Sequence, residues 1–314
     1  MTNTTMQAAR AHDYGAPEVL ALEQAPRPEP NADQVLIRLK AAGVNPADWK
    51  YRSGAYKQYM PLTFPWIPGI EGAGIVEAVG ANVTTLKKGD EIYGIVSGGY
   101  AEYALALAND VQRKPAGLTF EQAAAIPIGS LTAWGAVIDT AKVETGQKVL
   151  IHGAAGGVGA YAVQLAKWKG AHATGTASAD NIEFVRSLGA DDVIDYNATR
   201  FETVLRDMDA VIDTVGGDLP ERSFPVIRPG GILVTIAAML PEDAGKAHNI
   251  RAVSAGRAST DTLKQVSELI EAKQLKPIVG PVFSLTEVRQ AHELSQTCHG
   301  RGRIILQIGN GKSG

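Results

Sequence analysis

The sequence between Val149 and Gly170 contains a glycine-rich turn typical of a phosphate-binding loop. Ala154–Gly159 reads A-A-G-G-V-G; it follows an apolar run, Lys148–His152, and precedes a segment with helical apolar spacing. Glycine lets a pyrophosphate approach the backbone, and the following helix supplies unpaired N–H groups and a partial positive charge. This strand–turn–helix context predicts a dinucleotide site; the alternative is a tight turn that holds no ligand. The residues predicted to hold the dinucleotide are Ala155, Gly156, Gly157, Val158 and Gly159.

The end of the next expected strand, His172–Thr176, indicates which dinucleotide is bound. An NAD site needs an acidic residue about 20 residues after the glycines, where it binds the ribose 2′-hydroxyl. Ser178 stands 19 positions (178 − 159) after Gly159, and this neutral donor suits a 2′-phosphate that an acid would repel. No lysine or arginine stands beside Ser178, and its alternative role is a helix cap. The sequence therefore favours NADPH, with Ser178 and Asn181 as cofactor contacts.

The middle of the chain alternates strand and helix patterns, which predicts an α/β domain with a doubly wound parallel sheet. The continuous apolar run Lys148–His152 is expected of a parallel strand buried on both faces. Further strands are expected at His172–Thr176, Asp192–Tyr196, Ala210–Thr214 and Ile232–Ala237, and helices at Leu131–Ala141 and Asp180–Leu188. We assign residues 126–257 to this dinucleotide-binding domain.

The flanking segments read as short strands separated by Pro and Gly, a pattern typical of a small β barrel. Gln34–Ala41 alternates apolar and polar residues at period two, which predicts a half-buried strand. Further strands are expected at Gly74–Gly80, Glu91–Val96, Tyr100–Leu105, Pro277–Leu285 and Arg303–Ile308, and helices at Leu118–Ala125 and Thr260–Lys273. Thr119 and Gln122 are spaced as a capping box. We assign 1–125, completed by 258–314, to a second domain.

Composition excludes several classes of function. The chain has 314 residues, 45% hydrophobic and 20% charged, as expected of a globular protein with two domains. A net charge of −3 and the absence of a basic tract argue against nucleic-acid binding. With Cys298 as the single cysteine, no intrachain disulfide can form. We find no signal-peptide pattern or membrane span and expect a cytoplasmic protein.

Four further motifs carry a resemblance to a known family. They are AAGVNPADWKYRSGAY, PGIEGAGIVEAVG, KKGDEIYG and RGRIIL. With the glycine turn, they make the chain resemble the medium-chain dehydrogenase/reductase superfamily, in its zinc-free quinone oxidoreductase and enone reductase branch. The resemblance covers almost the whole chain. It implies a GroES-like barrel domain, a Rossmann NADP(H)-binding domain, hydride transfer from NADPH to quinones or α,β-unsaturated carbonyls, and a homodimer.

The resemblance also predicts that no catalytic metal is bound. Zinc alcohol dehydrogenases of this superfamily carry a cysteine where this chain has Asn45, and a histidine where it has Ile70. Isoleucine cannot bind zinc and asparagine is a poor ligand. The histidines form no ligand-spaced group; they are His12, His152, His172, His248, His292 and His299. Beside Ile70 stands Glu71, a lone acid in an apolar run, for which we expect a structural role and a buried partner.

Without a metal, hydrogen-bond donors must polarise the substrate carbonyl as negative charge builds on its oxygen. Asn45 matches a family asparagine near the nicotinamide ribose and the substrate, so it is both a catalytic and a cofactor candidate. Lys50 stands where quinone reductases have a tyrosine and some plant enone reductases a lysine, which favours an enone as substrate. Tyr56 matches a second tyrosine of the quinone reductases. The alternatives are a turn residue at Asn45, a solvated charge at Lys50 and a packing role for Tyr56.

The resemblance assigns further cofactor contacts. Thr132 matches a threonine near the nicotinamide and the phosphates, and Tyr196 matches a residue that flanks the adenosine 2′-phosphate. Ile236 and Ala237 are expected to end the fifth strand of the sheet, at the carboxyl edge where ligands bind. The leading hypothesis is therefore a zinc-independent, NADPH-dependent reductase of a small-molecule quinone or enone. The alternatives are an NADPH-binding module with little catalysis and an alcohol dehydrogenase.

Overall fold

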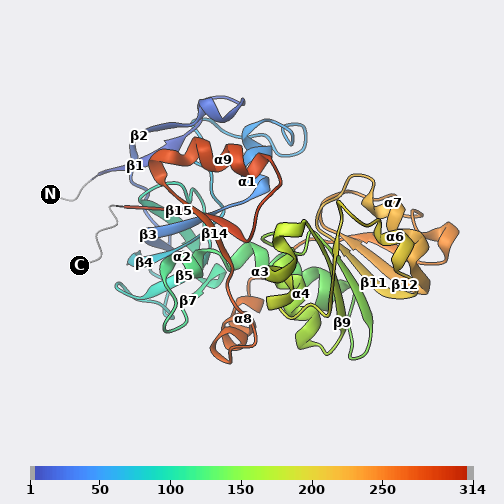
Figure 1. Ribbon diagram of the computed structural model, residues 1–314. Helices are drawn as coiled ribbons and strands as arrows, with labels where there is room; N and C mark the ends of the chain where they lie inside the picture. Colours follow the sequence, from blue (N-terminus) through green and yellow to red (C-terminus); the bar gives the residue numbers. More distant parts are fainter. Residues whose placement is uncertain (1–3, 310–314) are drawn as a thin grey trace. The chain divides into compact units, whose positions relative to one another are not determined.

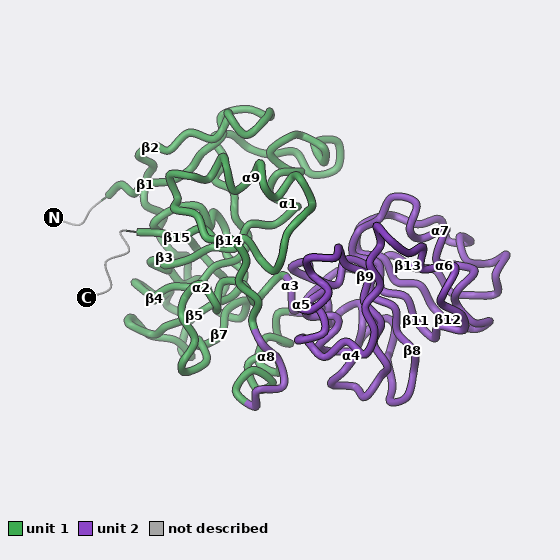
Figure 2. The backbone as a smooth tube through the Cα atoms, in the orientation of Figure 1, with its two compact units in different colours: residues 1–128, 260–271, 277–314 green, residues 129–259, 272–276 purple. Residues whose placement is uncertain are grey.

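The computed structural model describes residues 4–309 of the 314-residue chain, which form two compact units (Figure 1, Figure 2). Unit 1 holds the chain up to Ile128, together with Thr260–Glu271 and the chain from Pro277 onward. Unit 2 holds Gly129–Ser259 and Ala272–Lys276. The unit boundaries follow Ile128 and Ser259, whereas the sequence-based division was placed after residues 125 and 257. That division also kept the segment 272–276 with the first domain.

Unit 1 is built on a seven-stranded sheet with the strand order β14-β15-β3-β4-β5-β7, in which β6 also pairs with β3. All strand pairs of this sheet are antiparallel except β14 with β15. A separate antiparallel pair joins β1 and β2. The strands are β1 (Thr5–Arg10), β2 (Ala21–Pro26), β3 (Gln34–Val44), β4 (Glu71–Val79), β5 (Glu91–Ile95), β6 (Tyr103–Leu107), β7 (Val111–Arg113), β14 (Val279–Ser284) and β15 (Arg303–Gln307).

β3 is longer and more deeply buried than its period-two pattern predicts. It pairs with β15, β4 and β6, so that most of its residues lie inside the core. Val35, Ile37 and Leu39 from β3 pack in one cluster with Val76 and Leu306, each at most 2% exposed. The long central strand therefore positions the beginning of β4, where Glu71 stands, and the beginning of β15, where Arg303 stands.

The described part of unit 1 contains the α-helices α1 (Pro46–Arg52), α2 (Phe120–Ala124), α8 (Thr262–Glu271) and α9 (Val288–Gln296). Thr119 and Gln122 form the expected capping box of α2, since each side chain accepts a hydrogen bond from the other's backbone N–H. Helix α9 was not predicted. It buries Val288, Ala291 and His292 against the unit, and it follows a second capping box between Ser284 and Glu287.

Unit 2 is built on a six-stranded parallel sheet with the order β10-β9-β8-β11-β12-β13. This is the 3-2-1-4-5-6 order of a Rossmann fold, which confirms the predicted doubly wound sheet. The strands are β8 (Lys148–His152), β9 (His172–Ala177), β10 (Asp192–Asp195), β11 (Met208–Asp213), β12 (Ile227–Thr235) and β13 (Arg251–Ser254). Strand β12 ends at Thr235, so the expectation that Ile236 and Ala237 end this strand is wrong, and they begin the following loop.

The helices of unit 2 follow its strands along the chain. They are α4 (Gly159–Trp168), α5 (Ile182–Ser187), α6 (Phe201–Val204) and α7 (Leu219–Ser223). Helix α3 (Pro127–Trp134) precedes them and continues into a π-helical segment, Gly135–Thr140, where the sequence predicts one α-helix. A Cβ at Gly135 would lie 2.5 Å from the carbonyl oxygen of Gly256. The wider π turn therefore begins at a glycine that admits another backbone segment.

Candidate functional site

The glycine turn joins β8 to α4 in the way that a dinucleotide site requires. Gly153 has a φ of +69°, and α4 begins at Gly159. A Cβ at Gly159 would lie 2.1 Å from the carbonyl oxygen of Gly153, so only glycine fits where the helix meets the strand. A Cβ at Gly156 would meet that same oxygen alone, at 3.3 Å. The N–H of Gly156 donates to the carbonyl of Gly153 at 2.9 Å, so the turn is held by its own backbone, and a side chain at Gly156 would be in close contact with that carbonyl alone.

Helix α3 lies against the same turn. A Cβ at Gly129 would be 2.4 Å from the carbonyl oxygen of Gly157, which shows how closely the two backbones approach. Thr132 stands three positions (132 − 129) further along α3 and is half-buried. The structure thus brings the helix of Thr132 to the glycine turn, as a cofactor contact at this position would require.

The predicted 2′-phosphate contacts gather at the end of β9. Asn181 Nδ2 donates to Ser178 Oγ at 3.0 Å, and the backbone N–H of Tyr196 donates to the carbonyl of Ala177 at 3.2 Å. Ser178 precedes the 3₁₀ turn Ala179–Asn181, but its hydroxyl accepts no hydrogen bond from the backbone of that turn. Ser178 therefore occupies the N-cap position of this turn, as the alternative role predicts, but its side chain does not cap it. The Ser178 hydroxyl accepts from Asn181, so its hydrogen can be donated to a ligand. Tyr196, at the same strand end, is 49% exposed.

A buried polar network that we did not predict fixes the carboxyl edge of the sheet. Asp213, the last residue of β11, accepts from the backbone N–H groups of Val215 and Gly216 and from the hydroxyl of Thr235. Thr235 Oγ1 in turn accepts from the backbone N–H of Ala237 at 3.1 Å. One buried carboxylate thus orders the loops after two strands, including the predicted cofactor contacts Ile236 and Ala237. The sequence could have indicated this role, because Asp213 directly follows the apolar residues of a buried strand, at the edge of the sheet where ligands bind.

His152, the last residue of β8, is a further buried polar residue directly before the glycine turn. Its ring nitrogens lie 3.2 Å from Thr176 Oγ1 and 3.0 Å from Ser223 Oγ, and the residue is 1% exposed. Burial lowers the pKa of His152 to about 4, although Asp213 acts in the opposite direction. The imidazole is therefore neutral near pH 7 and serves to hold the ends of β8 and β9.

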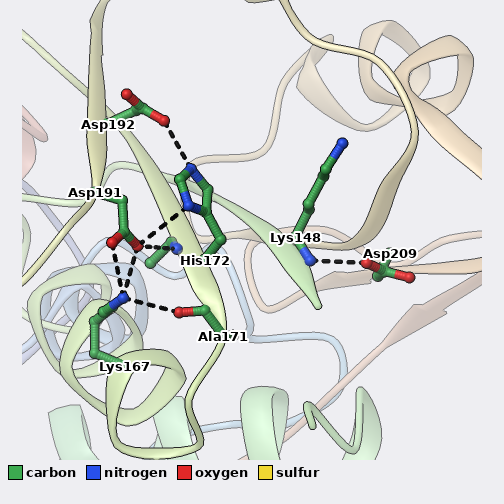
Figure 3. A network of polar contacts seen from close by, with 8 residues as sticks. Lys148, Lys167, Ala171, His172, Asp191, Asp192 and Asp209 are labelled. Atoms are coloured by element: carbon green, nitrogen blue, oxygen red, sulfur yellow. Dashed lines mark hydrogen bonds and ion pairs between the residues drawn. The ribbon is translucent and has the colours of Figure 1, made fainter. Parts of the chain in front are cut away.

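The opposite, amino edge of the same sheet carries a second polar network (Figure 3). His172 Nε2 lies 2.7 Å from Asp192 Oδ2, and Lys167 Nζ lies 2.7 Å from Asp191 Oδ2. Asp209 accepts from the backbone N–H of Lys148 at 2.7 Å. These exposed pairs join the beginnings of neighbouring strands, and ligands of such sheets bind at the other edge. We interpret this network as structural.

In unit 1 the candidate site is centred on Asn45, which precedes α1. The residue is 1% exposed, its backbone N–H donates to Asp48 Oδ2 at 2.8 Å, and its Nδ2 donates to Glu71 Oε1 at 2.8 Å. Its Oδ1 has no hydrogen-bond partner within the described residues 4–309. The capping box that begins α1 places the Asn45 side chain next to the backbone N–H of Asp48, so both ends of the amide face groups of the protein.

Glu71 is fully buried and has three polar neighbours. Oε1 accepts from Asn45 and lies 3.2 Å from Nε of Arg303, which is 4% exposed, and Oε2 accepts from the backbone N–H of Ile128 at 2.7 Å. Burial raises the pKa of Glu71, while Arg303, Ile128 and Asn45 lower it. The expectation that Glu71 is buried with a partner is confirmed. The sequence did not reveal Arg303, although RGRIIL was among the motifs of the resemblance.

Asp48 and Tyr100 complete this polar cluster. The Tyr100 hydroxyl donates to Asp48 Oδ2 at 2.9 Å, and both residues are fully buried. Burial raises the pKa of Asp48 to about 7, although its hydrogen bonds from Asn45 and Tyr100 act against this. Asp48 therefore holds the backbone of Asn45 while carrying a proton for part of the time near neutral pH.

Lys50 and Tyr56 lie on α1 and in the turn that follows it, and both are half-buried. Lys50 Nζ is 5.6 Å from the ring centroid of Trp49, and the Tyr56 ring packs edge-on against Tyr51 at 5.3 Å. Asn45 hydrogen-bonds to Asp48 and Glu71, and within residues 4–309 the three predicted catalytic residues do not form one hydrogen-bonded group.

Two observations concern metals and membranes. Within residues 4–309, no group of three or more His, Cys, Asp or Glu side chains is arranged to hold a metal ion. Among the same residues, no helix has both the length and the apolar character needed to cross a bilayer.

Comparison with known proteins agrees with this architecture. The model of the alcohol dehydrogenase GroES-like domain matches residues 31–116, and that of the zinc-binding dehydrogenases matches residues 188–306. The quinone oxidoreductase of Sus scrofa is 34% identical over 326 residues, which cover 96% of this chain and 98% of the relative. The 2-methylene-furan-3-one reductase of Solanum lycopersicum is 34% identical over 318 residues, covering 96% of this chain and 79% of the relative.

Solved structures show the same fold. The quinone oxidoreductase from Coxiella burnetii has a TM-score of 0.89 at 33% identity, covering 97% of this chain and 100% of that one. A mycobacterial protein solved with NADPH has a TM-score of 0.86 at 27% identity, covering 96% of this chain and 99% of that one. The fold and the matches define an oxidoreductase with a GroES-like domain and a Rossmann domain. The chain belongs to the medium-chain dehydrogenase/reductase superfamily, in its quinone oxidoreductase branch.

Proposed function

We propose that this protein is an NADPH-dependent, zinc-independent reductase of a quinone or of the C=C bond of an α,β-unsaturated carbonyl compound. The observation that carries the proposal is the glycine turn that joins β8 to α4, where Gly159 leaves no room for a side chain, in a parallel sheet with Rossmann order. Relatives named as a quinone oxidoreductase and a furanone reductase support both classes of substrate.

The choice of NADPH is supported by the end of β9. Ser178 and Asn181 present a neutral hydroxyl and an amide there, which suit a phosphate, whereas NAD sites place an acid at this point. The backbone of Tyr196 is hydrogen-bonded to the same strand end, and the residue is 49% exposed. The presence of NADPH in the mycobacterial structure supports the same choice.

The chemistry follows from the polarity of the substrate. When bound, the nicotinamide supplies a hydride, which adds to the carbon β to the carbonyl of an enone. Negative charge then builds on the carbonyl oxygen, and a donor beside this oxygen lowers the barrier. We propose Lys50 Nζ and the Tyr56 hydroxyl as these donors, because α1 and the turn after it carry both side chains. The lysine at position 50 favours an enone.

Zinc independence is proposed from the residues themselves. Asn45 and Ile70 stand where zinc relatives have ligands, and Asn45 Nδ2 is already bound to Glu71. Metal analysis of the purified protein tests this proposal: we expect substoichiometric zinc and unchanged activity after chelation. Zinc in equimolar amount, with activity lost on its removal, would instead indicate an alcohol dehydrogenase.

The experiment that tests the reductase is an assay of NADPH oxidation with a panel of quinones and enones, run beside equilibrium binding of NADPH and NADH. We expect turnover with at least one class of acceptor and tighter binding of NADPH than of NADH. Tight binding of NADPH without turnover would support the alternative, a binding module with little catalysis.

We also propose that the protein is a cytoplasmic homodimer without a nucleic-acid partner. The net charge of −3 supports the last point, since an acidic protein repels phosphate backbones. Sedimentation of the purified chain tests the oligomeric state, and a single species of monomer mass at all concentrations would contradict the dimer.

A further inference from the structure

A surface pocket lies in unit 2, away from the glycine turn. Its volume is about 430 Å³, and it is formed by the last turn of α4, the end of α5 and the segment Ala272–Lys276. Small-molecule sites typically have volumes of about 300–1,000 Å³. We propose that this pocket binds a small organic anion with an aromatic ring, through the ammonium groups of Lys273 and Lys276 and the indole of Trp168. This inference goes beyond the proposed function and does not depend on it.

The pocket is separate from the predicted dinucleotide site. Helix α4 begins at Gly159 in the glycine turn and ends at Trp168, so its ten residues span about 15 Å between the two places. Lys167, beside Trp168, belongs to the polar network at the amino edge of the sheet (Figure 3). Ligands of Rossmann sheets bind at the carboxyl edge. A ligand in this pocket therefore does not compete with the dinucleotide.

The residues that line the pocket carry positive charge and no negative charge. They include Lys167, Lys273 and Lys276, and no Asp or Glu is among them. The charge of Lys167 is compensated, because its Nζ lies 2.9 and 2.7 Å from the two carboxylate oxygens of Asp191. Lys273 and Lys276 are exposed, and neither forms an ion pair in the described part of the chain. Two uncompensated ammonium groups beside one cavity favour an anionic ligand.

Gln164 fixes the segment that carries these two lysines. Its side chain is buried in α4, where Nε2 donates to the carbonyl of Lys276 at 3.2 Å and Oε1 accepts from the backbone N–H of Lys276 at 2.8 Å. Nε2 also donates to the carbonyl of Ala160 at 3.1 Å. Leu275, which is 1% exposed, anchors the same segment. The backbone of Lys276 is therefore held on α4 before a ligand binds, which reduces the entropy lost on binding.

Trp168 supplies an aromatic surface to the pocket. Its ring centroid lies 5.8 Å from that of Trp134, which is 6% exposed, and Trp168 itself remains 38% exposed. Trp134 thus supports the indole, part of which stays accessible. The half-buried side chain of Leu188 lines the same pocket. Because an aromatic ring is stabilised by offset or edge-on packing against an indole, a ring-bearing anion fits this lining better than a bare inorganic anion does.

Titration calorimetry with four probes tests the class of ligand. Phenyl phosphate and benzoate combine a ring with an anionic group, inorganic phosphate lacks the ring, and benzyl alcohol lacks the charge. We expect saturable binding of at least one aromatic anion at one site per chain, about tenfold weaker binding of inorganic phosphate, and no binding of benzyl alcohol. The comparison of phenyl phosphate with benzoate distinguishes a phosphate ligand from a carboxylate. Added salt should weaken the binding, because both lysines are exposed to solvent.

Matched variants locate the site. Lys273 has a φ of +58°, so Lys273→Gly removes the ammonium group at a position where the backbone suits glycine. Lys276→Gln keeps the backbone hydrogen bonds to Gln164. We expect each variant to bind the aromatic anion about tenfold more weakly than the wild type. Lys142→Gly is the control and should bind as the wild type does, because Lys142 has a φ of +53° and is exposed in the same unit, outside the pocket.

Tryptophan fluorescence tests the contact with Trp168 directly. Binding of the aromatic anion should change the emission of the wild type, since the accessible part of the indole becomes covered. Trp168→Phe keeps a ring at this position and should lose most of this change.

The inference is wrong if neither aromatic anion binds saturably, or if Lys273→Gly and Lys276→Gln bind it as tightly as Lys142→Gly does. Displacement of the anion by saturating NADPH would place it in the dinucleotide site and would equally overturn the inference. Equal affinities for inorganic phosphate and the aromatic anions would exclude a ring-bearing ligand. Because the titration needs no NADPH, a chain that binds no dinucleotide would contradict the proposed function alone.

Discussion

Arg303, at the start of the last strand, places its Nε 3.2 Å from Oε1 of Glu71, at the start of β4, and both side chains are buried. The pair is separated by most of the chain and closes unit 1 across β3. Because the guanidinium compensates the buried carboxylate, removing it would leave a charge without a partner. Arg303 therefore offsets the desolvation penalty of the Glu71 carboxylate, and only folding brings these two residues close together.

We predict that Arg303→Met lowers the free energy of unfolding by about 3–5 kcal/mol, because it leaves the buried carboxylate of Glu71 without a counter-charge. Urea denaturation measures this change. Arg38→Met is the matched control, since Arg38 is 41% exposed and lies 4.0 Å from Glu77 on the same strand as Glu71; we expect a loss below about 1 kcal/mol there. Equal losses of unfolding free energy in the two variants would show that the buried ion pair contributes no more to stability than the exposed one.

Two substitutions in the glycine turn should separate folding from binding. Gly159→Ala places a Cβ 2.1 Å from the carbonyl of Gly153, so we expect it to destabilise unit 2 by about 1–3 kcal/mol. Gly156→Ala brings its Cβ to 3.3 Å from the same carbonyl, a tight contact but a longer one, so it should cost less stability than Gly159→Ala and weaken NADPH binding at least tenfold. Denaturation and equilibrium binding measure the two effects. If a folded Gly156→Ala variant binds NADPH with unchanged affinity, the pyrophosphate does not bind at this turn.

Ser178→Asp should shift the preference from NADPH towards NADH, because a carboxylate repels the 2′-phosphate and can accept from a ribose 2′-hydroxyl. The ratio of kcat/KM values for the two cofactors measures this preference, and we expect it to change by at least tenfold. Ser187→Asp introduces the same charge on the exposed surface of α5 and should leave the ratio unchanged. A constant ratio in both variants would exclude Ser178 as the selector.

Lys50→Ala should lower turnover with an enone more than it lowers the affinity for NADPH, because its ammonium is proposed to act on the developing oxyanion. We expect a loss of kcat of about tenfold to a hundredfold. Lys57→Ala removes an exposed charge from the turn after α1 and serves as the control. If both variants retain the kcat of the wild type, Lys50 is a solvated charge.

His292 predicts a dependence of stability on pH. It is fully buried, neither ring nitrogen has a hydrogen-bond partner within residues 4–309, and burial, with a contribution from Arg52, lowers its pKa to about 3. Between pH 6.5 and about 3 the unfolded chain thus binds a proton that the folded chain rejects, so stability is lost as the pH falls. The loss from this one group is about 1.4 kcal/mol per pH unit within that window.

We therefore expect His292→Phe to make the acid limb of the curve of unfolding free energy against pH shallower. His152, whose pKa of about 4 acts in the same direction, is present in both proteins and cancels in the comparison. His299→Phe, at the exposed surface, should leave the curve unchanged. A limb as steep in His292→Phe as in the wild type would show that His292 does not titrate in this way.

The sequence predicted the parts of the fold that local patterns encode. Strand β8 begins at Lys148 and ends at His152 as expected, and the glycine turn opens α4. The last strand of the sheet, β13, was missed because its four residues form an edge with little apolar content. Helix α9 was missed although the Ser284–Glu287 capping box before it was readable.

The partners of Glu71 could not be read from the sequence for a different reason. Ile128 contributes a backbone N–H from 57 positions away, and Arg303 arrives with the last strand. Such contacts depend on the register between β3, β4 and β15, which no local pattern specifies. The sequence did indicate that a lone acid in an apolar run needs a partner. One of the partners of Glu71 is the side-chain amide of Asn45.

The most direct test of the proposed reaction is a single-turnover measurement of NADPH oxidation with cofactor carrying hydrogen or deuterium at the reactive nicotinamide carbon. The protein is mixed with either cofactor and with the best acceptor of the quinone and enone panel. We predict protein-dependent oxidation that is slower with the deuterated cofactor, because a carbon–hydrogen bond breaks in the measured step. Equal rates with the two cofactors, or no oxidation with any acceptor, would contradict hydride transfer by this protein.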